Sequence, residues 1–177
     1  LVRHVADRLA PVIDELVVNC REDQHGAIQD ALRDYEHPVT YTFDEQPDAG
    51  PLHGIDRGLS AVDSTYAVVV ACDMPFVDPA FVDHLFAVAE GRDGAIPRYG
   101  DEGWFQPLQA VYHVDAMRAA VAAAEAEDID RPIEAARKVD FKTVEGEALW
   151  ERADEWTFFN VNTREDLAEA ESHLASH

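Results

Sequence analysis

The feature that most constrains the fold is an uninterrupted apolar run, Tyr66-Ala-Val-Val-Val-Ala-Cys72, which ends at Asp73-Met-Pro75. Short runs rich in β-branched residues are typical of parallel strands that are buried on both faces. Such strands need helices on both sides of the sheet, because helical crossovers join parallel neighbours. The run therefore predicts an α/β fold with a buried strand over residues 66–72.

Helical and strand patterns alternate along the rest of the chain. This alternation favours crossovers onto one sheet, and 177 residues suffice for a single core. We predict a doubly wound, mostly parallel sheet in a three-layer α/β/α arrangement, with residues 1–177 forming a single domain. The predicted helices are Val2–Ile13, Gly26–Tyr35, Leu52–Val62, Asp78–Gly91, one from Asp115, Arg131–Val139 and a last one capped by Thr163. The predicted strands are Leu16–Cys20, Val39–Phe43, Tyr66–Cys72, Ala95–Tyr99, Gln109–His113, Phe141–Val144 and Thr157–Val161.

The order of the elements suggests a missing beginning. The first predicted element is a helix, whereas a doubly wound sheet usually begins with a central strand and a glycine-rich turn. We therefore expect residues 1–177 to lack the first strand and glycine-rich loop of the natural protein. A sheet without its central strand would have unpaired edges in its interior.

The chain is strongly acidic, with 36 Asp and Glu against 14 Lys and Arg and a net charge of −22. Only Lys138 and Lys142 are lysines. The charge would repel nucleic acids and anionic membranes, so we expect neither as a partner. Molar salt shortens the Debye length to about 3 Å and would screen the repulsion within the chain. We interpret the composition as adaptation to a salt-rich, halophilic cytoplasm; an ordinary acidic protein is the alternative.

The remaining composition supports a cytoplasmic location. No apolar stretch approaches the roughly 20 residues of a membrane-spanning helix. Cys20 and Cys72 lie far apart and form no CxxC pair or zinc-ligand spacing. A disulfide scaffold is therefore not expected, and a reducing compartment fits the two cysteines.

Polar residues stand where the predicted strands end. Asn19, Asp44 and Asp73 end three of the strands, and Asn160 and Asn162 lie at the end of the last. Ligands of open α/β sheets bind beyond the carboxyl ends of the strands. These side chains are therefore the first candidates for a binding site.

Asp73 is the strongest of these candidates. A carboxylate at the end of an apolar strand suits a hard cation such as Mg²⁺, which prefers oxygen ligands and can neutralise phosphate charge. Asp73 could instead cap the turn or the next helix. Asn19 and Asp44 could likewise be turn-forming residues. Asn160 and Asn162 alternate along the predicted strand and would face the same side, or they could serve the cap of the following helix.

Four segments together resemble the molybdenum cofactor guanylyltransferases. In chain order they are Asp48-Ala-Gly-Pro-Leu-His-Gly54, Ala71-Cys-Asp-Met-Pro75, Gln106-Pro-Leu-Gln-Ala-Val-Tyr112 and Phe159-Asn-Val-Asn-Thr163. The resemblance covers essentially the whole chain, and it implies a Rossmann-like nucleotidyltransferase fold. The implied reaction joins GMP from GTP to the molybdopterin-bound molybdenum cofactor and releases pyrophosphate.

The resemblance also implies roles for individual residues. Asp73 matches the Mg²⁺-binding and catalytic aspartate, and it lies on the GTP side. The other implied nucleotide contacts are Asn19, Asp44, Gly50, Pro51 and Leu52, and the implied pterin-side contacts are Gln106, Pro107, Asn160 and Asn162. The implied partners are GTP, the molybdopterin cofactor and a molybdoenzyme or a cofactor-delivery protein.

The chain departs from the family pattern in three places, one of which is a loop at Asp44 that is one residue shorter than usual. The opening Leu-Ala-Gly-Gly segment, with the Arg and Lys that cradle the triphosphate, is not in the sequence, and Gln106-Pro107 replaces His-Pro or Glu-Pro. Two alternatives stay open. One is another nucleotidyltransferase of this fold, acting on a cytidylyl, sugar-phosphate or cobamide-phosphate substrate. The other is a non-catalytic subunit that binds the cofactor.

Overall fold

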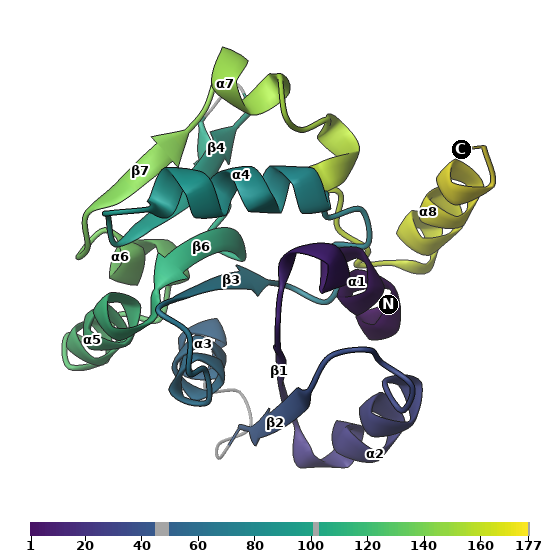
Figure 1. The fold of residues 1–177 in the computed structure, drawn as a ribbon, viewed down its shortest axis with the longest axis horizontal. Coiled ribbons are helices and arrows are strands. Elements are labelled where there is room, and N and C mark those ends of the chain that lie inside the picture. Colours follow the sequence, from purple (N-terminus) through teal and green to yellow (C-terminus); the bar gives the residue numbers. More distant parts are fainter. Residues whose placement is uncertain (45–49, 101–102, 177) are drawn as a thin grey trace.

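The computed structural model describes residues 1–44, 50–100 and 103–176 (Figure 1). The main sheet has the order β3 (Tyr66–Val70), β6 (Gln109–His113), β4 (Gly94–Tyr99) and β5 (Trp104–Phe105), and β7 (Phe141–Val144) pairs with β4. Strand β6 runs antiparallel to both β3 and β4, whereas β7 is parallel to β4. Strands β3, β4 and β7 therefore point the same way.

A second, smaller sheet contains β1 (Leu16–Cys20) and β2 (Val39–Phe43). These strands are parallel, with Leu16 opposite Val39 and Cys20 opposite Phe43. Helix α2 (Glu22–Ala31) connects them and contributes no buried residue. Strands β1 and β2 with helix α2 therefore form a complete strand–helix–strand crossover whose helix buries no residue.

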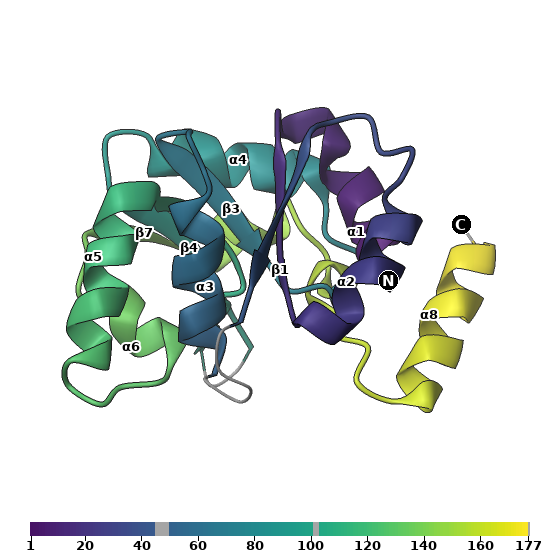
Figure 2. The ribbon, with the colours of Figure 1, turned by 90° about the horizontal axis from the view of Figure 1, so that it is seen from below.

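Helices cover the sheets on two sides. On one face, α4 (Pro79–Ala89) and α1 (Val2–Leu9), which continues into η1 (Ala10–Val12), pack on β3. On the other face, α3 (Pro51–Ser60), α5 (Val114–Glu125) and α6 (Pro132–Ala136) share a core with β6. Figure 2 shows α4 on one side of the main sheet and α3 and α5 on the other. The predicted three-layer α/β/α class is confirmed.

The carboxyl-terminal part contains α7 (Glu147–Trp150), η2 (Glu155–Phe158) and α8 (Arg164–Ser176). Helix α8 stands apart at one end of the molecule (Figures 1 and 2), and its only buried residue is Ala170. Within the described ranges, no helix is both long and apolar enough to cross a membrane.

A cleft of about 730 Å³ lies between the two sheets, where β1 and β3 face each other. Helix α1 lines one side of it with Val5 and Leu9, and helix α3 lines another with Ile55 and Leu59. The described strands of the two sheets form no pairing across this cleft.

Most predicted elements are confirmed, but the buried strand predicted over residues 66–72 spans Tyr66–Val70 and is only half-buried, because it lines the cleft. The strand predicted over Thr157–Val161 is wrong. Residues Glu155–Phe158 form the short helix η2 instead, because Asp154 caps it: its carboxylate accepts from Thr157 N at 3.0 Å, and Thr157 Oγ1 accepts from Asp154 N at 3.4 Å. This reciprocal cap satisfies the helix start.

Two further features differ from the sequence analysis. The antiparallel strand β6 follows β4 after too few residues for a helical crossover, so the chain turns back through β5, which is not among the predicted strands. Helix α2 begins at Glu22 rather than Gly26. Acidic residues Glu22 and Asp23 in its first turn complement the helix dipole, which extends the helix toward β1.

Candidate functional site

The predicted site residues gather at one edge of the structure. At the opposite edge, Ser64 Oγ donates to Glu15 Oε1 at 3.3 Å just before β3 and β1 begin. Asn19 and Cys72 both line the far end of the cleft. Strands β1 and β3 therefore run in the same direction, and their carboxyl ends meet at this edge, as the sequence predicted.

Asn19 and Asp44 form a hydrogen-bonded pair. Asn19 Nδ2 donates to Asp44 Oδ1 at 2.7 Å, and Thr42 Oγ1 donates to Asn19 Oδ1 at 2.9 Å. The Asn19 amide is thus fixed from both ends, and it holds the Asp44 carboxylate at the end of β2. Two residues 25 positions apart in sequence therefore act as one polar unit.

The loop before α3 brings a helix start beside this pair. Gly50 has φ +85°, a conformation that favours glycine, and Pro51 occupies the first turn of the helix. A Cβ on Gly54 would lie 3.0 Å from Asn19 Nδ2, so the helix approaches Asn19 as closely as glycine allows. Leu52 points into the core and is 2% exposed. Asp48 and Ala49 of the same motif lie outside the described residues.

Asp73 lies directly after the strand β3 and has an unused oxygen. Its Oδ1 is buried and has no hydrogen-bond partner among the described residues. The cap of the next helix is a different residue, Asp78, whose Oδ1 accepts from Phe81 N at 3.0 Å. Asp73 is therefore free of the helix-capping role that the sequence left open, and its carboxylate is available to a ligand.

The chemistry of Asp73 fits a magnesium ion that is shared with a phosphate. Among the described residues, no three His, Cys, Asp or Glu side chains form a metal-binding group. Mg²⁺ keeps several waters and is usually held by one or two carboxylates together with substrate phosphates. One buried carboxylate oxygen without a partner suits that mode of binding and does not suit an all-protein cage.

The pKa of the Cys72 thiol depends on the charge of the Asp73 carboxylate. The residue as a whole is exposed, but local desolvation raises the pKa of its thiol, and the negative charge of Asp73 raises this pKa further. Neutralising Asp73 would therefore lower the pKa of the Cys72 thiol.

The segment 159–163 lies against Asp73 through the backbone. Val161 N donates to the carbonyl oxygen of Asp73 at 2.8 Å. Asn160 is half-buried, and its Nδ2 donates to Phe158 O at 3.1 Å. Asn162 is exposed, and its backbone N donates to Asp166 Oδ2 at 2.9 Å.

These contacts show that the segment 159–163 is not the predicted strand. Asn160 and Asn162 still flank Val161, which bonds to Asp73. Since the segment is not a strand, alternation does not place Asn160 and Asn162 on a common face. Thr163 Oγ1 accepts from Asp166 N at 3.1 Å, and Asp166 Oδ2 accepts from Thr163 N at 2.8 Å, which confirms the predicted cap of α8. The capping role that the sequence left open for Asn162 is therefore present in its backbone.

Gln106 and Pro107 lie at the same edge. Gln106 N donates to Pro97 O at 2.9 Å, and Tyr112 Oη donates to Pro107 O at 2.9 Å. The next residue, Leu108, accepts through its carbonyl from Ala71 N at 3.0 Å, two positions before Asp73. The motif around Gln106 is thus adjacent to the end of β3.

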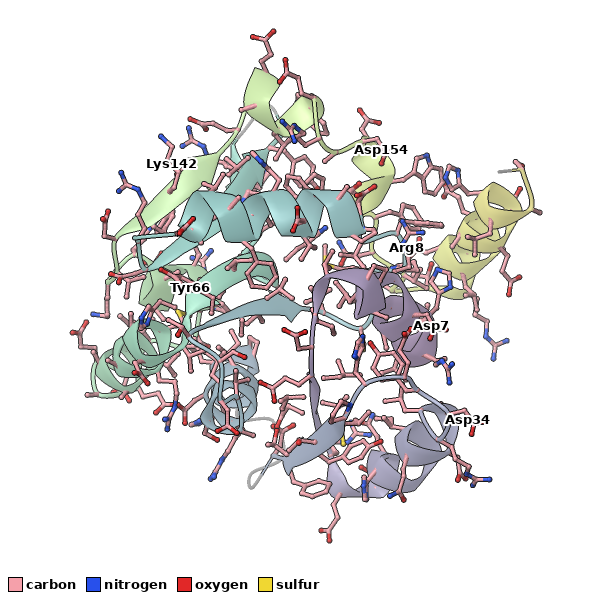
Figure 3. The ribbon with its side chains drawn as sticks, viewed as in Figure 1. Asp7, Arg8, Asp34, Tyr66, Lys142 and Asp154 are labelled. Carbon is pink, nitrogen blue, oxygen red and sulfur yellow. The ribbon has the colours of Figure 1, made fainter. Side chains whose placement is uncertain are left out.

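Two polar residues near this edge were not singled out from the sequence. Gln109 is fully buried, and neither atom of its amide has a partner among the described residues. Arg8 Nε donates to Val77 O at 2.6 Å, and in Figure 3 this side chain lies between α1 and the nearest end of α4. The sequence does not single out Arg8, because an arginine on an amphipathic helix gives no signal that its side chain will bond to a distant backbone carbonyl.

Polar groups at the carboxyl edge of a three-layer α/β sheet are typical of nucleotide-binding proteins of this architecture. The comparison with known families agrees: the chain belongs to the family of the MobA-like NTP transferase domain, whose model matches residues 1–141. A relative from Natronomonas pharaonis, described as a probable molybdenum cofactor guanylyltransferase, is 44% identical over 176 residues. The match covers 99% of this chain and 85% of that relative.

Solved structures share the fold. Molybdopterin-guanine dinucleotide biosynthesis protein A from Archaeoglobus fulgidus aligns with a TM-score of 0.76 and 25% identity, over 98% of this chain and 85% of the other. The 4-diphosphocytidyl-2C-methyl-D-erythritol synthase from Anaerococcus prevotii aligns with a TM-score of 0.74 and 16% identity, over 98% and 88%. The second likeness shows a common fold alone.

Proposed function

We propose that this protein transfers GMP from GTP to the molybdopterin-bound molybdenum cofactor. A terminal phosphate oxygen of the acceptor forms a bond to the α-phosphorus of GTP, the bond from that phosphorus to the bridging β-phosphate oxygen breaks, and pyrophosphate leaves. The observation that carries the proposal is the buried, unpartnered Oδ1 of Asp73 at the carboxyl edge. The family to which the protein belongs and the names of its relatives support guanylyl transfer over other nucleotide chemistry.

The two halves of the site divide the work between donor and acceptor. We assign GTP to the side of Asn19, Asp44 and the Gly50-Pro51-Leu52 loop, where the Asn19–Asp44 pair fixes polar groups at 2.7 Å. We assign the pterin cofactor to the side of Gln106, Pro107, Asn160 and Asn162. Asp73 lies between the halves, because its backbone bonds to Val161 and its chain neighbour Cys72 lines the cleft with Asn19.

Asp73 is the residue that would hold Mg²⁺. A bound magnesium ion supplies charge neutralisation on the phosphates, which is the main requirement of phosphoryl transfer. The protein's own contribution is positioning: the bond from Val161 N to Asp73 O holds the backbone of Asp73 against the acceptor segment, and the Asn19–Asp44 pair fixes the donor side.

The experiment measures pyrophosphate release by the native protein in molar salt with GTP, the acceptor cofactor and Mg²⁺. We expect Asp73→Asn or chelation of Mg²⁺ to lower the rate by at least about a hundredfold, in the range of a lost electrostatic contact. Asp63→Asn is the matched control, because this exposed aspartate lies at the opposite edge, before β3. Equal turnover with CTP, or full activity of Asp73→Asn, would contradict the proposal.

We also infer a cytoplasmic, salt-rich setting for the reaction. Both cysteines are free, which suits a reducing compartment. A net charge of −22 suits an environment that screens repulsion. A molybdoenzyme or a cofactor-delivery protein would receive the product there.

A further inference from the structure

Two tryptophans are exposed beyond the acceptor side of the candidate site. Trp104 of β5 is 60% exposed, and Trp150 of α7 is 44% exposed. Among the described residues, Phe43 is the only other aromatic residue in the group of exposed large hydrophobic side chains. Single exposed apolar residues are normal, whereas a contiguous apolar patch beside polar groups is typical of a binding surface. The question is therefore whether the two indoles form one surface.

Tyr99 connects the two indoles. It is the register partner of Trp104 on the neighbouring strand, so both side chains lie on the same face of the sheet. The rings of Tyr99 and Trp150 have centroids 6.0 Å apart and planes at 79°. Below them, the buried ring of Phe158 stacks on Tyr99 at 4.5 Å and 21°. Tyr99, Trp104 and Trp150 thus form one aromatic surface on a fixed base.

The aromatic surface is continuous with both parts of the proposed acceptor side. Gln106 N donates to Pro97 O at 2.9 Å, which extends the β4–β5 ladder by one residue. Because side chains alternate along a strand, Gln106 lies on the same face as Trp104. From the other direction, Asn160 Nδ2 donates to the carbonyl oxygen of Phe158, the base of the aromatic surface. Two side-chain amides therefore border the aromatic rings.

The two faces of the β4–β5 hairpin differ in what covers their rings. On the opposite face, Arg98 and Arg137 lie over the ring of Phe105, at 5.4 and 5.9 Å from its centroid. On the near face, a Cβ on Gly100 would touch the Trp104 indole at 3.8 Å, so glycine keeps this side of the ring clear. An exposed indole bordered by amides suits a flat heteroaromatic ring, which stacks through its face and hydrogen-bonds through its edge.

We propose that the aromatic surface binds the flat part of the pterin ring system of the acceptor. Trp104 is the main stacking residue, and the amides of Gln106 and Asn160 face the polar edge of the ring. Trp104 would thereby select an acceptor with a flat ring over one that carries only a phosphate. The identity of the ring rests on the proposed function, whereas the preference for a flat heteroaromatic ring rests on the aromatic surface itself.

The first test measures the binding of hydroxymethylpterin to the native protein by isothermal titration calorimetry, in molar salt without GTP or Mg²⁺. Trp104→Leu keeps an apolar side chain but removes the aromatic face, and it should weaken binding about tenfold or more. Trp104→Phe keeps an aromatic ring and should weaken binding by less than about threefold. Phe43→Leu is the matched control, because it removes an exposed ring at the end of β2 on the donor side.

Phe43→Leu should leave the affinity for the pterin unchanged. Equal affinities of Trp104→Leu and the parent protein, or equal losses in Trp104→Leu and Phe43→Leu, would overturn the proposal. So would the absence of measurable pterin binding by the parent protein. None of these measurements involves nucleotide transfer. A protein that fails the Asp73→Asn test of guanylyl transfer can therefore still show Trp104-dependent binding of the pterin, and the reverse can also be observed.

The second test separates stacking from a structural role of Trp104. A ring proton of the pterin that lies over an indole shifts upfield in the NMR spectrum on binding. We expect this shift in the parent protein and in Trp104→Phe, and we expect it to vanish in Trp104→Leu. If the aromatic surface is instead a contact between two copies of the chain, Trp104→Leu will lower the sedimentation coefficient and leave the pterin shift unchanged. That result would overturn the proposal.

Discussion

The two sheets have the same local pattern but very different surroundings. Ala110, Val111 and Tyr112 of β6 are fully buried between helices on both faces. In β1, only Cys20 is buried, and the following helix α2 has no buried residue. Because the unit of β1, α2 and β2 buries so little, we expect its stability to depend on its sheet neighbours. The main sheet supplies the stable platform, and the small sheet carries Asn19 and Asp44 at its margin.

The largest expected difference between the sheets is in hydrogen exchange. The β1 amides that face the cleft should exchange roughly a thousandfold faster than the amides of β6. The β1 edge has no partner strand among the described residues, whereas β6 has partners on both sides. Exchange monitored by NMR in molar salt checks this, and similar protection of both strands would show that the sheets unfold as one unit.

The next largest expected difference between the two sheets is the loss of unfolding free energy when a side chain is shortened. Leu85 of α4 is fully buried over the main sheet, so Leu85→Ala should lower the free energy of unfolding by about 2–5 kcal/mol. Val18 of β1 is only half-buried, and Val18→Ala should cost roughly 1 kcal/mol, near the centre of the range for single substitutions. Urea titration in molar salt measures both, and equal losses would contradict the distinction between the sheets.

A substitution at Gln109 should stabilise the main sheet. Both polar atoms of this fully buried amide lack partners, and such groups carry a desolvation cost of about 1–3 kcal/mol. Gln109→Leu should therefore raise the free energy of unfolding by about 1 kcal/mol. Gln29→Leu on exposed α2 is the control and should change little. A loss of stability in Gln109→Leu would indicate that the amide has an unrecognised partner.

The smallest expected effect concerns the two thiols, one at the end of each sheet. Burial raises the pKa of Cys20, and Asp44 and Asp23 add to the rise, while desolvation and then Asp73 raise the pKa of Cys72. A raised pKa lowers the thiolate fraction at pH 8. Neutralising Asp73 should lower the pKa of Cys72 and speed its alkylation about threefold.

Alkylation rates at pH 8, measured by mass spectrometry of the labelled peptides, test this with two perturbations. Asp73→Asn should speed alkylation of Cys72 and leave Cys20 unchanged. Mg²⁺ at millimolar concentration should do the same in the parent protein and have no effect in the Asp73→Asn variant. An equal response of both cysteines would argue against metal binding at Asp73, independently of any measured turnover.

The sequence predicted the parts of this fold that depend on local pattern. The strand 109–113 was recognisable because burial imposes its composition, whereas the half-buried run at β3 and the strand 39–43 were recognisable from their β-branched and aromatic residues. The antiparallel direction of β6 was not predictable from periodicity, since it follows from a short connection through β5. The segment 157–161 looked like a strand because apolar residues dominate it, and the Asp154–Thr157 cap decided its structure instead.

The candidate site, like the fold, was only partly predictable from the sequence. Asn19, Asp44 and Asp73 were found because they end strands, and strand ends converge by topology. The hydrogen bond between Asn19 and Asp44 and the missing partner of Gln109 depend on tertiary contacts at the scale of single atoms. Arg8 was missed because its contact with Val77 joins distant parts of the chain.

The hydrogen bond between Val161 and Asp73 has a consequence for the order in which the protein matures. Synthesis on the ribosome runs from the amino terminus, so Asn19, Asp44 and Asp73 emerge well before residue 161. The acceptor segment can join Asp73 only when nearly the whole chain has been made. A nascent or truncated chain that ends before this segment would have Gln106 and Pro107 but would lack Asn160 and Asn162, so under the proposed assignment its acceptor side would be incomplete. Under the same proposal, such an incomplete chain could not hold the acceptor properly beside the nucleotide, so it would not consume GTP in a transfer.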